Sequence, residues 1–162
     1  MGHSFGGYET AFAITQTPLF AAAIAGGAIT DLNSFYHTIN SSSGRSEMWR
    51  FGTEQWSMRK TPYEAPDSYL SNSPLTHVKQ LQTPLLLWAG KNDWQVDTHQ
   101  SLEFYLALRR LGKKGIMLLY PNEMHSLSNP VNQTDLTDRI LQWFDFFLKG
   151  NKPEDWIEKG IQ

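Results

Sequence analysis

The sequence predicts an α/β fold in which parallel strands form the middle layer and helices cover both faces of the sheet. Two observations point to it. Strand-like and helix-like segments alternate through the second half of the chain. The strand-like segments are continuous apolar runs, as expected for strands buried on both faces. Segments of this order and length connect by right-handed crossovers, which makes the sheet parallel.

The first half of the chain contains one clear helix and one strand. Residues 5–17 are predicted to form a helix that stops at Pro18. The run "FAAAIAGGAIT", residues 20–30, is predicted to be a short buried strand. Residues 31–74 are the least regular, with a short helix expected within 47–59. Aromatic residues throughout this region indicate that it packs against the rest of the domain.

Two buried strands in the second half are easier to recognise. They are "TPLLLWAG", residues 83–90, and "KGIMLLYP", residues 114–121. A helix through "SLEFYLALRRL" lies between them and ends at Gly112. Asp97 is expected to cap the start of this helix, with Gln100 as its capping-box partner.

The last predicted helix has one apolar face. Its apolar residues recur at helical spacing: Leu136, Ile140, Trp143, Phe144, Phe147 and Leu148. Gly150 is expected to end this helix. Residues 1–150 are therefore predicted to be one domain, and residues 151–162 a C-terminal tail.

Composition and charge narrow the class of protein. The chain has 162 residues, enough for one domain, and is 40% hydrophobic with a net charge of −2. Its Lys and Arg residues form no basic stripe, which argues against nucleic acid as a partner. The absence of cysteine excludes disulfides and thiolate metal sites. No apolar run approaches the length of a membrane span, so no membrane partner is expected.

The first residues of the chain contain a motif that can carry chemistry. Gly2-His3-Ser4-Phe5-Gly6 fits the pattern G-x-S-x-G, a tight strand-to-helix turn that exposes a nucleophilic serine. By composition alone, roughly one chain in twenty of this length would contain the pattern by chance. A glycine-rich turn without chemistry is the alternative interpretation. The helix that directly follows favours the nucleophile.

A serine nucleophile needs a histidine base, and that base needs a carboxylate to orient it. Hydrolases with this turn place the three groups in the chain order Ser, acid, His. Asp93 lies three residues after "LLLWAG", and His125 lies four residues after "IMLLYP". Both follow the carboxyl end of a predicted strand, where parallel sheets place their active sites. The sequence therefore predicts a catalytic triad of Ser4, Asp93 and His125.

Other candidate residues fit this role less well. Asp97 is better explained as a helix cap, and Asp31 comes too early in the chain for the acid. Glu123 is expected to be a solvated loop charge. The remaining histidines, expected to be surface or internally satisfied groups, are His3, His37, His77 and His99. No pair of residues has metal-ligand spacing such as H-E-x-x-H, so neither a metal nor another cofactor is expected.

Three stretches closely resemble the prolyl oligopeptidase family of serine peptidases, in its dipeptidyl-peptidase and acylaminoacyl-peptidase branches. They are "GHSFGGYET", "SPLTHVKQLQTPLLLWAGKNDWQV" and "LLYPNEMHSL". Ordinary lipases share the serine turn but rarely the following Gly7 and Tyr8. They also rarely have Ser-Pro-Leu ahead of the acid strand, or G-x-x-D-x-x-V around the acid. The resemblance extends from Gly2 to about Gly150 and implies an α/β-hydrolase fold.

The resemblance also implies roles for individual residues. Ser4 matches the nucleophile, Asp93 the acid and His125 the general base, while Phe5 would offer its backbone N–H to the oxyanion hole. Gln95 occupies the position of an asparagine that contacts the substrate backbone in dipeptidyl peptidases.

Phe35 and Tyr36 lie where those enzymes have aromatic residues lining the pocket for the residue before the cut. The weaker aromatic match here leaves a strict preference for proline open. The implied partner is a short peptide substrate.

In this family a β-propeller domain and the first five strands of the hydrolase sheet precede the serine turn. One loop of those strands carries a second oxyanion donor. The resemblance therefore implies the C-terminal portion of a catalytic domain, with the N-terminal strands missing and weak or no activity alone. It also implies that the strand within residues 22–29 is a bare sheet edge, which favours a homo-oligomer. An esterase or thioesterase of the same fold, and a binding module without catalysis, are the alternatives.

Overall fold

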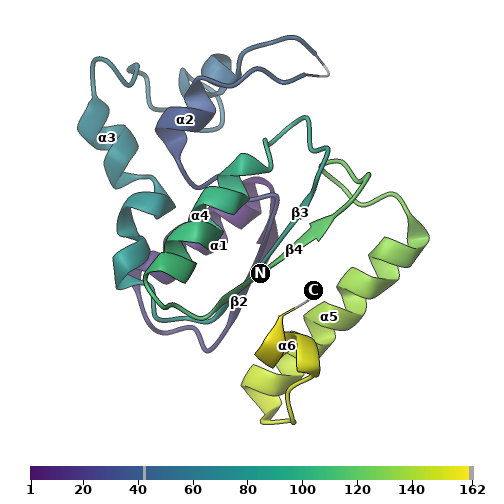
Figure 1. The fold of residues 1–162 in the computed structure, drawn as a ribbon. Helices are drawn as coiled ribbons and strands as arrows, with labels where there is room; N and C mark the ends of the chain where they lie inside the picture. Colours follow the sequence, from purple (N-terminus) through teal and green to yellow (C-terminus); the bar gives the residue numbers. More distant parts are fainter. Residues whose placement is uncertain (42, 161–162) are drawn as a thin grey trace.

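The computed structural model describes residues 1–41 and 43–160, and its centre is a parallel sheet of four strands in the order β1-β2-β3-β4 (Figure 1). The strands are β1 (Gly2–His3), β2 (Ala23–Gly26), β3 (Leu85–Gly90) and β4 (Gly115–Tyr120). The helices are α1 (Phe5–Gln16), α2 (Leu32–Tyr36), α3 (Pro66–Ser71), α4 (His99–Arg110), α5 (Pro130–Lys149) and α6 (Asp155–Lys159), with the 3-10 helices η1 (Glu47–Phe51) and η2 (Pro74–Gln80). The predicted parallel α/β arrangement is confirmed.

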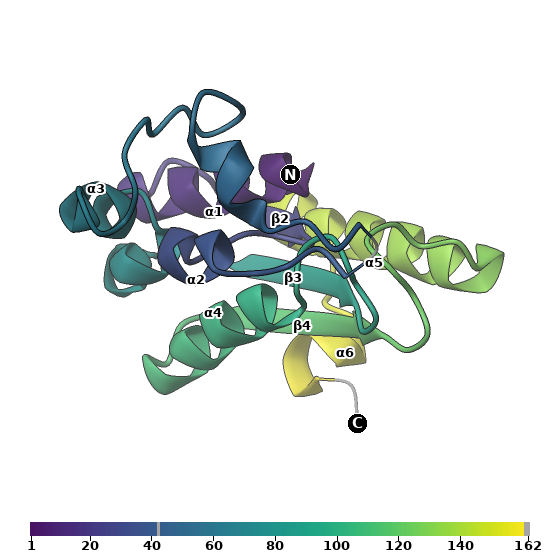
Figure 2. The same ribbon diagram turned by 90° about the horizontal axis from the view of Figure 1, so that it is seen from above.

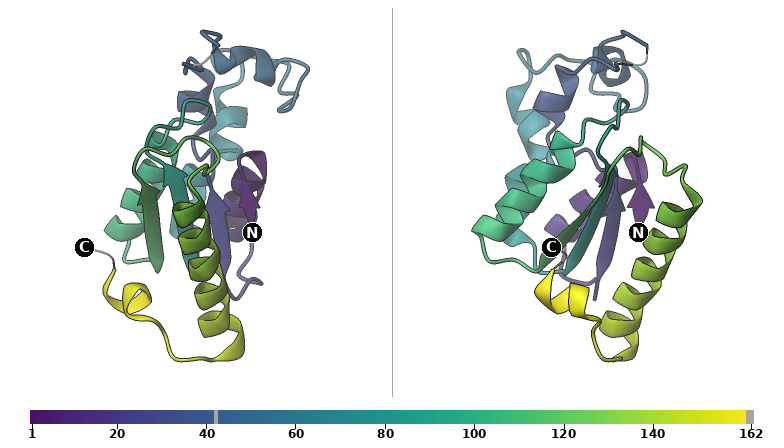
Figure 3. Two further views of the ribbon diagram at one scale, coloured as in Figure 1. Left: turned by 90° about the vertical axis from the view of Figure 1, so that its right-hand side faces the viewer. Right: turned by 45° about the vertical axis from the view of Figure 1, so that its right-hand side comes forward.

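Helices cover the sheet on both faces, which gives the core two halves (Figures 2 and 3). Leu85 and Leu87 of β3 pack with α1 and α4 on one face. Leu86 and Trp88 pack with Trp143 of α5 on the other face. Successive side chains of a strand point to opposite faces, so a strand covered on both sides must be apolar at every position. This is why "LLLW" reads as a continuous run.

The last long helix begins and ends where its sequence signals indicate. The Asn129 side chain accepts a hydrogen bond from the Val131 N–H (2.8 Å), and Pro130 occupies the first helical position. Gly150 adopts the left-handed conformation (φ 70°) that ends many helices. The predicted end of this helix is confirmed.

In the capping box predicted for α4, Asp97 accepts a hydrogen bond at the start of the helix as expected, but the prediction for Gln100 is wrong. The Asp97 side chain accepts from the His99 N–H (2.8 Å), as a residue at a helix start does. The Gln100 side chain points elsewhere, and its Oε1 accepts from the N–H groups of Thr30 (2.9 Å) and Asp31 (3.0 Å). These N–H groups follow β2, where a buried donor without a partner would be costly.

The segment between α2 and β3 packs through its aromatic residues, as expected. Phe51 is buried against Tyr36 and Tyr69, with ring centroids 5.3 and 5.5 Å away. The short helix expected within 47–59 is the 3-10 helix η1, which ends at Phe51. The chain then turns through Ser57 and Arg59, both with positive φ, which a right-handed helix cannot accommodate.

The edge of the sheet differs from the prediction of a bare strand. Gly2 and His3 form β1, which pairs with Ala25 and Gly26 in the second half of β2. The register of β1 leaves the first half of β2 without a β1 neighbour. Two residues before the serine turn are therefore enough to cover half of this edge.

The segment predicted to be a tail includes the short helix α6. The Trp156 Nε1–H donates to Gln142 Oε1 of α5 (2.7 Å), and Ile157 packs against the α5 side of the core. Residues 161–162 of the predicted tail lie outside the described residues. Within the described part of the chain, no helix combines the length and apolarity that crossing a membrane requires.

Candidate active site

Ser4 occupies a strained turn between β1 and α1. Its backbone has φ 60° and ψ −121°, a conformation that is costly for a residue with a side chain. Two hydrogen bonds hold it: the Ser4 N–H donates to the Gly26 carbonyl (2.8 Å), and the Ser4 carbonyl accepts from the Tyr8 N–H (3.0 Å). A sharp, strained strand-to-helix turn of this kind presents a serine hydroxyl at the sheet edge.

Glycines around the turn allow the backbones to approach closely. A Cβ on Gly2 would lie 2.1 Å from the Gly6 carbonyl oxygen, and one on Gly7 would lie 2.6 Å from the Gly26 oxygen. A Cβ on Gly6 would meet nothing within 4 Å. Of these three glycines, Gly2 and Gly7 therefore have no room for a side chain, and Gly6 has.

Asp93 and His125 form a buried hydrogen-bonded pair. The His125 Nδ1 lies 2.7 Å from Asp93 Oδ2, and the Asp93 side chain is only 1% exposed. The other oxygen, Oδ1, accepts from the N–H groups of Gln95 and Val96, both at 2.9 Å. A carboxylate only accepts hydrogen bonds, so the neutral His125 ring carries its proton on Nδ1 and leaves Nε2 with a free lone pair.

The predicted triad residues lie at one edge of the sheet. Ser4 follows β1, Asp93 follows β3 and His125 follows β4, and the carboxyl ends of parallel strands share an edge. The Nε2 of His125 is buried and has no hydrogen-bond partner in the described structure, so Ser4 does not contact it by a hydrogen bond. Such bonds between catalytic groups are often long before a substrate binds.

The loop that carries His125 is built around Glu123, which the sequence interpretation placed in solvent. This prediction is wrong: Glu123 is 2% exposed. Its carboxylate accepts from the Ser128 N–H (2.7 Å), the Asn129 N–H (3.1 Å) and the Asn132 amide (2.7 Å). These hydrogen bonds lower the pKa of Glu123, and the bond from the Ser128 N–H contributes most to the shift. A tight loop before a helix leaves N–H groups that need an acceptor, and Glu123 supplies it.

Gln95 lies on an open pocket beside the buried pair. The pocket has a volume of about 390 Å³, and Asp93, Trp94 and Asp97 also line it. His37 also lines this pocket, and its ring bonds to the Asn33 carbonyl and the Tyr63 hydroxyl.

Phe35 and Tyr36 do not line this pocket. They are 2% and 8% exposed and belong to the aromatic cluster of the irregular segment. Phe5 reaches the same cluster, with its ring 5.0 Å from Trp56. The backbone N–H of Phe5 lies in the first turn of α1, where no helix carbonyl can accept it.

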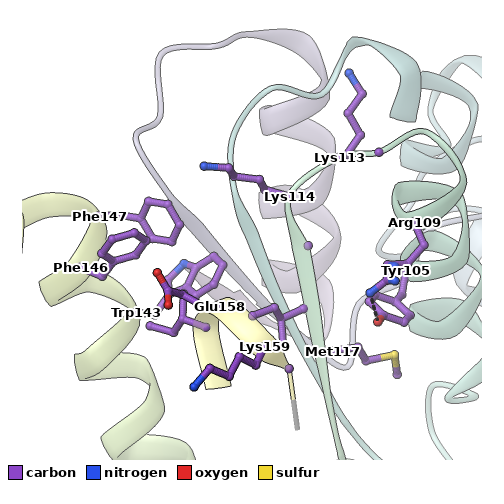
Figure 4. Close-up of a pocket in the computed structure, with 15 residues that line it drawn as sticks. Tyr105, Arg109, Lys113, Lys114, Met117, Trp143, Phe146, Phe147, Glu158 and Lys159 are labelled. Atoms are coloured by element: carbon purple, nitrogen blue, oxygen red, sulfur yellow. Dashed lines mark hydrogen bonds between the residues drawn. The ribbon is translucent and has the colours of Figure 1, made fainter. Parts of the chain in front are cut away.

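A second, more voluminous pocket shares no residue with the predicted site. It has a volume of about 770 Å³ and lies between α4, β4, α5 and α6 (Figure 4). Trp143 and Phe147 line it from α5, and Lys114 lines it from the position directly before β4. None of the predicted site residues lines it. Among the described residues, no cluster of three or more His, Asp or Glu side chains could hold a metal ion.

A parallel sheet with a strained serine after one strand and a buried Asp–His pair after two others defines an α/β hydrolase. The chain belongs to the prolyl oligopeptidase family, whose model matches residues 1–151. The resemblance inferred from the motifs is thus confirmed, and with it the class of enzyme, a serine peptidase by descent.

Relatives and solved structures agree with this assignment. The chain is 29% identical over 150 residues to the uncharacterized peptidase YuxL of Bacillus subtilis, covering 91% of this chain and 22% of that protein. It is 30% identical over 159 residues to the acylamino-acid-releasing enzyme of Rattus norvegicus, covering 91% and 20%.

Among solved structures, the acylaminoacyl peptidase of Pyrococcus horikoshii superposes with a TM-score of 0.79 at 26% identity, covering 99% of this chain and 26% of that one. A puromycin-hydrolyzing peptidase of Mycobacterium tuberculosis superposes with a TM-score of 0.82 at 29% identity, covering 94% and 22%. The predicted α/β-hydrolase fold is confirmed. The chain spans only about a fifth to a quarter of the length of these proteins.

Proposed function

We propose that the chain carries the catalytic triad of a serine peptidase that cleaves short peptides, with Ser4 as nucleophile, His125 as base and Asp93 as acid. The observation that carries the proposal is the buried Asp93–His125 pair, whose Nε2 lacks any described partner. It lies at the same sheet edge as the strained Ser4. A structural histidine at such a place would be expected to use both ring nitrogens.

In this mechanism the Ser4 Oγ attacks the carbonyl carbon of the scissile peptide bond. His125 Nε2 takes the hydroxyl proton, while Asp93 holds the Nδ1–H and stabilises the imidazolium. The tetrahedral oxyanion accepts a hydrogen bond from the Phe5 N–H. His125 then gives its proton to the leaving amine, and water hydrolyses the acyl-enzyme by the same steps.

Gln95 is assigned a contact with the substrate backbone, which its place beside Asp93 on the open pocket supports. Phe35 and Tyr36 are assigned to the wall of the side-chain pocket. Their burial makes them a support behind the Phe5 and Trp56 rings rather than the outermost surface. The reaction needs no cofactor, because each proton transfer has a side chain to perform it.

The test compares Ser4→Ala with Ser71→Ala, an exposed serine of α3 far from the proposed triad in the chain. Short peptide p-nitroanilides measure turnover, and a fluorophosphonate probe measures the nucleophile itself without needing a complete substrate cleft. Both are applied to the protein that carries this chain. Ser4→Ala is expected to lose labelling and to lower turnover by roughly a thousandfold or more. Ser71→Ala is expected to behave as the parent.

Other outcomes have distinct meanings. Turnover or labelling that persists in Ser4→Ala would refute the proposal. Cleavage of p-nitrophenyl acyl esters without cleavage of peptide anilides would indicate an esterase or thioesterase of the same fold. A binding module would retain its ligand after the substitution.

A further inference from the structure

His3 makes a hydrogen bond that the proposed mechanism does not use. Its Nε2 lies 2.7 Å from the backbone carbonyl oxygen of His125. His3 is the residue directly before Ser4, and His125 is the proposed base. One side chain therefore connects the strand that holds the nucleophile to the backbone of the base, 122 residues further along the chain.

The His3 ring packs against two other rings. It stacks on Trp88 of β3 with a centroid distance of 4.9 Å and an interplanar angle of 3°. It also contacts the His125 ring, with a centroid distance of 4.6 Å and an interplanar angle of 38°. Stacking fixes the position of the His3 side chain, so its hydrogen bond is rarely released. The bond therefore restrains the backbone of His125.

The backbone beneath the stack is shaped to admit these rings. A Cβ on Gly26 would lie 2.2 Å from the Trp88 ring. One on Gly27 would lie 3.2 Å from His125 Cε1 and 3.4 Å from His3 Nε2, and Gly27 has a positive φ of 48°. The glycine pair at the end of β2 thus leaves room for the three rings at this edge.

We propose that His3 is a positioning residue: it donates its Nε2–H to the His125 carbonyl and holds the base at a fixed place relative to Ser4. The inference depends on the proposed function for its effect on turnover. The carbonyl can only accept, so Nε2 carries the proton. The titratable groups near His3 are His125 and Asp93. Burial is the main cause that lowers the pKa of His3, and it favours the neutral Nε2–H form at neutral pH.

The test distinguishes the effect of the His3 hydrogen-bond donor from the effect of its aromatic ring. His3→Phe keeps a ring for Trp88 but removes the donor, while His3→Gln keeps an amide N–H at a similar reach. We expect kcat to fall about tenfold in His3→Phe with KM little changed, and to recover in His3→Gln to within a few-fold of the parent.

His77→Phe is the matched control. Its Nε2 also contacts a backbone carbonyl, that of Ser71 at 2.8 Å, but on η2, away from the proposed triad. We expect parent-like kinetics for it. Equal kinetics for His3→Phe and the parent, in a protein whose Ser4→Ala variant is inactive, would overturn the inference and leave the proposed function intact. Activity in Ser4→Ala would overturn the function instead.

Nuclear magnetic resonance of the 162-residue chain with labelled histidine gives a readout that needs no turnover. The ¹⁵N shifts of His3 in the unmodified chain should report the neutral Nε2–H form, and the Nδ1–H form would contradict the proposed bond whether or not any variant folds. The Nδ1 proton of His125, bonded to Asp93, should be strongly deshielded in the parent and in His3→Gln. Its unchanged resonance in a folded His3→Phe variant would also count against positioning.

Discussion

Gly6 and Gly7 are neighbours in α1, but Gly6 has room for a side chain and Gly7 does not. A Cβ on Gly7 would press on the Gly26 carbonyl oxygen and lie 3.1 Å from the Ala28 Cα, both backbone atoms that cannot rotate away. We expect Gly7→Ala to lower the free energy of unfolding by roughly 1–3 kcal/mol through overpacking.

Gly6→Ala is the control at the adjacent position, where a Cβ has open space and alanine favours the helix by up to about 1 kcal/mol. Urea denaturation of both variants measures the difference. A Gly7→Ala chain as stable as the Gly6→Ala chain would contradict this account. G-x-S-x-G includes Gly2 and Gly6 but not Gly7, so the pattern identifies only one of the two glycines whose neighbours leave no room for a side chain.

The loop between β4 and α5 depends on one buried carboxylate. Glu123 accepts three N–H groups in its ionised form, and its folded pKa lies below the usual value. A depressed pKa contributes stability that is present above the unfolded pKa and is lost as pH falls through the folded pKa. We therefore expect Glu123→Gln to have a lower Tm than the parent at pH 7, with the difference narrowing towards acid pH.

Thermal unfolding followed by circular dichroism between pH 3 and 7 would measure this. Glu158→Gln, an exposed carboxylate of α6, is the control and should show no such trend. A Tm difference for Glu123→Gln that is constant across this range would show that the loop needs the shape of the side chain and not its charge.

Helices and strands were predictable from the sequence where their burial requires apolar residues. β3 is covered on both faces, so its position was evident from consecutive apolar residues. The Asp93–His125 pair could be anticipated because each residue follows a strand. The partners of Gln100 and Glu123 could not, since each accepts N–H groups whose need arises from the fold. Gln100 is bonded to Thr30, 70 residues away in the chain. For a polar side chain, a local partner such as the one in a capping box competes with N–H groups that are distant in sequence and also need an acceptor.

At the scale of the whole molecule, the β1–β2 edge of the sheet is only partly paired. β1 pairs with only the second half of β2, and the chain that leads into β2 exposes Leu19 and Phe20, which are 85% and 48% exposed. An open strand edge beside apolar side chains favours pairing with another copy. We therefore expect the 162-residue chain to form a dimer or higher oligomer at micromolar concentration, measured by light scattering.

Lysine beside a strand edge opposes edge-to-edge pairing, because a second copy would bury its charge. Leu19→Lys with Phe20→Lys should therefore shift the chain towards a monomer. Leu148→Lys is the control. Leu148 is 58% exposed at the end of α5, so the substitution removes a comparable apolar side chain at a position distant in sequence from β2. The mass of this variant should equal that of the parent. A monomeric mass for the parent would refute self-association. A dimer that survives the double lysine variant but not Leu148→Lys would place the contact on α5, where the half-buried Phe147 lines the pocket of about 770 Å³.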